Sequence, residues 1–147
     1  MKKYLNYSLI YAIAALAAGV FYREFTKAMG FSGTTTLGKA HGHLFMLGMI
    51  VFLIIALFSA HFKEIKDKKP FRVFMCVYNT GVPLTAIMML VRGVFQVMGT
   101  ELSKGANAAI SGIAGIGHIL VGVGIILLIV SLKQCAVENE KTKEETK

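Results

Sequence analysis

The chain has 147 residues, of which 55% are hydrophobic, and its formal net charge is +8. A soluble domain of this size needs more polar surface than this composition supplies, which excludes an ordinary soluble globular protein. The excess of Lys and Arg does not indicate a nucleic-acid interface, because these residues flank apolar runs and are not interleaved with aromatic residues on a soluble face. We therefore expect an integral membrane protein whose surroundings are a lipid bilayer and which binds no nucleic acid.

Four apolar segments are long enough to cross a bilayer, whose hydrocarbon core of about 30 Å requires about 20 helical residues. They lie at residues 5–22, 37–62, 71–98 and 106–132. Short polar loops join them, as expected for helices that are antiparallel neighbours. The predicted fold is all-α: an up-down-up-down membrane four-helix bundle formed by residues 1–133.

The ends of these segments carry recognisable signals. The run Thr34-Thr35-Thr36 suits the N-cap of the second span, and Pro70 opens the third span where a missing N–H has little cost. Pro83, near the middle of the third span, is expected to kink it. Residues 134–147 form a purely polar tail, for which we expect disorder on the cytoplasmic side.

The distribution of basic residues predicts the orientation in the membrane. The side that carries both termini holds 11 Lys and Arg residues and the opposite side holds 5. Cytoplasmic segments of membrane proteins are enriched in Lys and Arg, so both termini are expected in the cytoplasm. The basic residues of the cytoplasmic side are Lys2, Lys3, Lys63, Lys66, Lys68, Lys69, Arg72, Lys133, Lys141, Lys143 and Lys147.

Two histidines, His41 and His118, lie inside the apolar spans, where ligand-type side chains are functional candidates by default. Both are expected in the outer half of the bundle, within a turn or two of each other in depth. His43 follows His41 by two residues and therefore points about 200° away around the helix, so only one of the two faces the bundle axis. His61 lies at the end of its span and is expected to be an interfacial residue.

Two imidazoles from facing helices form a common haem site in helical bundles, whereas zinc or copper prefers more protein ligands. The sequence thus predicts a haem b whose iron is held by His41 and His118, with His43 as the alternative ligand. Gly115 and Gly122, on the same helix face as His118, either leave space for the macrocycle or serve close helix packing. Arg23 and Arg92 at the outer edge either meet the haem propionates or extend to the lipid headgroups.

The string Lys39-Ala40-His41-Gly42-His43-Leu44-Phe45-Met46-Leu47-Gly48 resembles the second helix of haem–copper oxidase subunit I, in its low-spin-haem half. On that resemblance His41, rather than His43, takes the position of a haem ligand. The segment from Gly117 to Gly124 is similar to the helix with the opposite ligand, although one His of that family's HxH pair is absent. Tyr22-Arg23-Glu24 resembles the end of the first oxidase helix.

The chain also departs from the oxidases, because it has no copper-site histidine cluster and is about a third of their length. As a whole it resembles small, uncharacterised four-helix membrane proteins of bacteria that carry the Ala-His-Gly-His step at residues 40–43. The resemblance implies a multi-pass protein of the bacterial cytoplasmic (inner) membrane.

The expected function is one-electron transfer, or haem-based sensing of redox state or of a gas. The expected partner is a redox protein or a quinone, and both a monomer and a homo-oligomer fit the sequence. A six-coordinate iron has no free position for a substrate, which argues against an enzyme. Two alternatives remain open: a cofactor-free scaffold or small transporter subunit, and copper binding at the outer face.

Overall fold

The computed structural model describes residues 1–145 and contains four long helical spans in this part of the chain. They are α1 (Lys2–Ala28), the second span Leu37–His61, α4 (Lys69–Met98) and α5 (Lys104–Glu145). The second span consists of α2 (Leu37–His43), a π-helix η1 (Leu44–Ile50) and α3 (Val51–His61). A short 3₁₀-helix, η2 (Lys63–Asp67), connects α3 to α4. The predicted all-α fold with four apolar, membrane-spanning helices is confirmed.

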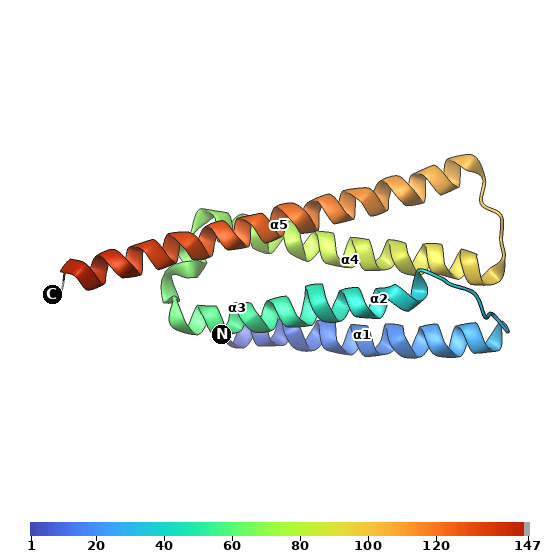
Figure 1. Ribbon diagram of the computed structural model, residues 1–147, viewed down its shortest axis with the longest axis horizontal. Coiled ribbons are helices and arrows are strands. Elements are labelled where there is room, and N and C mark those ends of the chain that lie inside the picture. Colours follow the sequence, from blue (N-terminus) through green and yellow to red (C-terminus); the bar gives the residue numbers. More distant parts are fainter. Residues whose placement is uncertain (146–147) are drawn as a thin grey trace.

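The helices follow one another across the bundle, with α1 next to the second span, α4 in the middle and α5 on the far side (Figure 1). α5 packs mainly on α4, and α1 packs mainly on the second span. Each of the two outer helices therefore has one face covered by a neighbour and another face left exposed, and the exposed apolar side chains are compatible with a lipid bilayer. The N-terminus and the extension of α5 lie at the same end of the bundle (Figure 1).

Glycines allow the closest helix contacts. Gly117 and Gly124 of α5 are buried against α4, where an added Cβ would lie 2.6 Å from Thr85 Oγ1 and 2.6 Å from the Tyr78 ring, respectively. Gly81 makes the reciprocal approach from α4, since its Cβ would lie 2.9 Å from the Val121 backbone nitrogen. Small residues at these positions let apolar helices pack closely where no hydrophobic effect drives them together.

The loop of residues 29–36 is held to α4 by polar contacts. Thr36 occupies the N-cap position of α2, but its hydroxyl donates to the Met89 carbonyl at 2.9 Å instead of capping its own helix. The Thr36 amide donates to Gln96 Oε1 at 2.9 Å. The threonine run thus marks the start of the span as expected, and its hydroxyls join that start to α4.

Two further boundaries follow ordinary helix chemistry. Pro70 lies in the first turn of α4, and Gly99 ends this helix in a left-handed conformation with φ 63°. Pro83 lies inside α4, which continues as helix on both sides of it.

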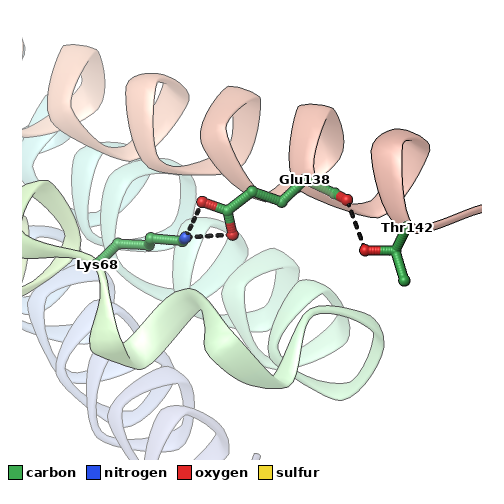
Figure 2. A network of polar contacts seen from close by, with 3 residues as sticks. All are labelled: Lys68, Glu138 and Thr142. Atoms are coloured by element: carbon green, nitrogen blue, oxygen red, sulfur yellow. Dashed lines mark hydrogen bonds and ion pairs between the residues drawn. The ribbon is translucent and has the colours of Figure 1, made fainter. Parts of the chain in front are cut away.

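The polar tail corrects one expectation. Residues 134–145 continue α5 as helix, whereas the sequence predicted disorder; residues 146–147 lie outside the described part. Glu and Lys are good helix formers, and a helix already nucleated in the membrane extends through them without a new nucleation step. An ion pair between Lys68 and Glu138 also ties this extension to the start of α4 (Figure 2).

Candidate functional site

The imidazole rings of His43 and His118 lie next to each other, although 75 residues separate them in the sequence. Their ring centres are 6.3 Å apart and the ring planes are nearly perpendicular, at 81°. His43 is the last residue of α2, and His118 lies about a third of the way along α5. Two helices that have little other contact are thus joined here by a pair of histidines.

Both rings are anchored in the same way, through Nδ1. His43 Nδ1 lies 3.0 Å from the Lys39 carbonyl oxygen, and His118 Nδ1 lies 2.8 Å from the Ala114 carbonyl oxygen. A carbonyl oxygen only accepts, so each Nδ1 donates a hydrogen, and the tautomer of a neutral ring that fits this contact has its Nε2 unprotonated. This is the tautomer found in metal-ligating histidines, whose other nitrogen donates to a carbonyl.

His41 points in a different direction. It lies against α1, where a Cβ on Gly19 would be 3.7 Å from the His41 Cβ. Its Nδ1 is buried and has no hydrogen-bond partner among the described residues. The separation of about 200° between positions two apart on a helix explains why His41 faces α1 while His43 faces α5. The ring that lies beside His118 is therefore that of His43, the alternative ligand, and not that of His41, the ligand expected first.

The glycines near His118 divide into two groups. Gly117 and Gly124 pack against α4, whereas Gly115 and Gly122 are exposed, and a Cβ on either would meet nothing within 4 Å. Gly115 and Gly122 lie three residues before and four residues after His118, so all three share one helix face. His118 therefore projects from a smooth surface with free space on both sides.

Arg92 reaches the same face of α5 from α4. Its Nη2 lies 2.6 Å from Ser111 Oγ and 3.5 Å from the Asn107 carbonyl oxygen. Ser111 precedes His118 by seven residues, two helical turns, which corresponds to about 10 Å along α5. A polar cavity of about 220 Å³ adjoins Arg92 and includes Gln96 in its lining.

The other sequence candidates lie apart from this cluster. The Arg23 side chain lies near the end of α1 and is 79% exposed, and its Nε is 3.6 Å from Glu24 Oε1. His61 is exposed and lies edge-on to Phe62, with ring centres 4.7 Å apart, at the end of the bundle that carries the termini. An apolar groove of about 660 Å³ runs between α1 and α4 over Leu44, and no histidine lines it.

The π-helix η1 is the feature of the site that the sequence did not reveal. Seven residues, Leu44–Ile50, form this wider helix directly after His43. The segment consists of apolar residues with one glycine, a pattern that ordinary membrane helices share.

A family model described as "Protein of unknown function (DUF2871)" matches residues 1–135. The chain belongs to this family. The match includes the first three spans of the DUF2871 chain, α5 as far as residue 135, and both histidines of the cluster. No curated protein and no solved structure matches the DUF2871 chain. Membership of an uncharacterised family, as predicted from the sequence, is thus confirmed. The Ala-His-Gly-His step as a mark of that family and the likeness to haem–copper oxidases stay predictions.

Proposed function

We propose that this protein binds one haem b between α2 and α5, with His43 and His118 as the axial ligands of the iron, and carries single electrons in the membrane. The observation that supports this most strongly is the pair of neighbouring imidazoles, each with Nδ1 bonded to a backbone carbonyl. Two imidazoles that held one metal from opposite sides, each through a nitrogen about 2.0 Å from it, would have ring centres about 6 Å apart. The observed separation of 6.3 Å agrees with that value.

The donor set favours haem over a bare metal ion. No group of three or more His, Cys, Asp or Glu residues suited to a metal ion occurs in the described part of the chain. Structural zinc takes four protein ligands, and copper sites commonly take three or more. A haem iron needs only two axial ligands from the protein, because the macrocycle fills its other positions.

The surroundings of His118 fit a macrocycle with its propionates toward Arg92. Gly115 and Gly122 leave the face beside the ring open, so a flat group can approach the helix backbone. Arg92 lies two turns from His118 toward the end of the bundle away from the termini, where its guanidinium can pair with a carboxylate. Arg23 has no contact with this face and is left out of the proposed site.

The expected chemistry follows from the ligand count. When bound, the haem supplies one-electron redox chemistry, and two histidine ligands leave no position for a substrate. We therefore propose electron transfer or redox sensing, with a quinone or a membrane protein as partner. The site is expected in the outer half of a bacterial cytoplasmic membrane, on the basis of the basic residues at the opposite end.

The test is the visible spectrum and metal content of the protein purified from cells with ample haem supply. We expect about one haem per chain, with the sharp reduced bands of a six-coordinate b-type centre. His43→Ala and His118→Ala should each lose six-coordination, and His61→Ala should keep it. A colourless, iron-free wild-type protein would overturn the proposal and favour the scaffold alternative, whereas copper without haem would favour the metal-binding alternative.

His41→Ala separates the two possible ligand pairs. With His43 as the ligand, His41→Ala keeps the six-coordinate spectrum, because its ring faces Gly19 and not the cluster. Loss of six-coordination in His41→Ala, together with its retention in His43→Ala, would restore the pair expected from the oxidase resemblance.

A further inference from the structure

The π-helix η1 begins at the residue after His43, the proposed axial ligand. In a π-helix each carbonyl bonds to an amide five residues ahead, so the turn is wider than in an α-helix. Such segments are rare in proteins and are frequently found at functional sites. Because the wider turn changes the rotation per residue, the direction in which His43 points depends on this segment keeping its π geometry.

Where the chain returns from π to α geometry, one backbone carbonyl lacks an amide of its own. Two successive carbonyls compete for one amide at that point, so a carbonyl is left with spare accepting capacity inside an apolar bundle. A buried polar group without a partner destabilises the conformation that contains it. The π geometry is therefore stable only where other donors reach these carbonyls.

Two side chains from neighbouring helices donate to carbonyl oxygens within η1. The Tyr78 hydroxyl of α4 donates to the Leu47 carbonyl at 2.8 Å, and the Ser8 hydroxyl of α1 donates to the Met49 carbonyl at 2.9 Å. Both residues are buried, with relative exposures of 0% and 5%. Between the two acceptors, Gly48 lies directly against the Tyr11 ring, where there is no room for a Cβ.

We propose that Ser8 and Tyr78 are positioning residues, which hold η1 in its π geometry from two sides and thereby direct the His43 ring toward His118. This inference rests on the proposed haem site, since His43 acts there as a ligand. Neither hydroxyl touches the histidine cluster itself. Their effect reaches it through the backbone of the second span.

The test compares variants that remove one hydroxyl each. Tyr78→Phe keeps the ring contacts with Phe74 and Phe52, at 5.0 and 6.2 Å, and loses only the bond to η1. Ser8→Ala removes the other donor, and Ser8→Thr restores a hydroxyl. Two matched controls are Tyr7→Phe, whose ring lies beside Phe52 at 5.1 Å, and Ser131→Ala, whose hydroxyl bonds only within α5.

We expect Tyr78→Phe and Ser8→Ala to release haem to an acceptor protein about 3- to 10-fold faster than wild type, which corresponds to the loss of one ordinary hydrogen bond. Their low-spin electron paramagnetic resonance signals should also shift, because the ligand ring changes its orientation. The controls and Ser8→Thr should match wild type in both measurements. Release rates and signals in Tyr78→Phe and Ser8→Ala that equal those of the controls would overturn the inference while leaving the haem site intact.

A haem-free wild-type protein would instead overturn the proposed function. The two hydrogen bonds from Ser8 and Tyr78 to η1, here called the hydroxyl clamp, are then tested by amide hydrogen exchange alone. Amide hydrogen exchange over residues 44–50 is expected to be faster in Tyr78→Phe and Ser8→Ala than in Tyr7→Phe and Ser131→Ala. Equal exchange in all four variants would reject the clamp as well.

Discussion

At the scale of single residues, the five glycines between positions 112 and 124 show how one residue type takes two roles. Gly117 and Gly124 are seven apart and face α4, while Gly115 and Gly122 are also seven apart and face open space. Positions 115 and 117 differ by about 200° around the helix, so the two pairs cannot share a face. The buried pair sets the distance between α4 and α5, and the exposed pair leaves the space beside His118.

This division predicts different effects of an added methyl group at the two pairs. Gly124→Ala places a Cβ 2.6 Å from the Tyr78 ring, and Gly117→Ala places one 2.6 Å from Thr85 Oγ1 and 3.0 Å from its backbone nitrogen. Overpacking of this kind typically destabilises a protein by about 1–3 kcal/mol. Thermal unfolding in detergent should show this loss in both variants.

Gly115→Ala and Gly122→Ala serve as the matched comparison, since their Cβ atoms meet nothing within 4 Å. We expect wild-type thermal stability for the haem-free forms of both variants and a reduced haem content after purification, because the methyl group fills space beside His118. If these two variants lost as much stability as Gly124→Ala, the assignment of the two glycine faces would be wrong.

The spacing of these glycines shows that they form two faces of the helix, but it does not show which face meets α4. For the same reason the residue pattern alone could not decide whether His41 or His43 faces α5. Periodicity gives the relative directions of side chains on a helix and leaves the rotation of the whole helix open. In a membrane this ambiguity is larger than in a soluble protein, since apolar residues cover the lipid-facing side as well as the packed side. The π geometry of η1 adds a rotation that no residue pattern of this chain signals.

At the scale of helices, the apolar runs located the four spans well and their ends less well. α1 continues past Tyr22 to Ala28, and α5 continues past Leu132 to Glu145. Hydropathy marks the stretch of helix that lies in hydrocarbon, whereas a helix ends where its hydrogen bonds and caps end. The polar extension of α5 shows this difference most clearly.

Lys68 ties that extension to the rest of the protein by an ion pair with Glu138, whose carbonyl accepts from Thr142 at 3.0 Å (Figure 2). The hydrogen bond to Glu138 raises the pKa of Lys68 above its ordinary value. A group whose pKa is raised in the folded state stabilises that state below its unfolded pKa and loses the effect as the pH rises through the folded value. From neutral pH up to about 10 the docked extension should therefore be insensitive to pH, and it should be released above that range.

A nitroxide label on Lys141→Cys, in a background without Cys76 and Cys135, measures this release as increased mobility. In Glu138→Gln the label should already be more mobile at pH 7 and lose its pH response. Glu140→Gln, which alters an exposed neighbour, should behave like the parent. A label whose mobility is the same in Glu138→Gln and in the parent would show that the ion pair does not hold the extension.

At the scale of the whole molecule, the histidine cluster and Arg92 lie toward one end of the bundle, and most of the basic residues lie at the other. Arg92 lies six residues before the end of α4, and His43 lies six residues after the start of α2, so both are about 9 Å from the end of the bundle opposite the termini. The loop of residues 62–68 at the other end carries three lysines. The direction of the bundle in the membrane therefore decides from which side the histidine cluster can be reached.

The excess of Lys and Arg beside the termini predicts that this end stays in the cytoplasm, because basic loops are retained on that side during insertion. Single cysteines introduced as Thr100→Cys and Asp67→Cys, again without Cys76 and Cys135, test this in intact cells with a membrane-impermeant maleimide. Thr100 follows the end of α4, and Asp67 precedes its start, so the two positions lie at opposite ends of one helix. We expect labelling of Thr100→Cys in intact cells and of Asp67→Cys only after the cells are opened. The reverse pattern would place the histidine cluster in the half of the bilayer that faces the cytoplasm, and a redox partner would then have to reach it from inside the cell.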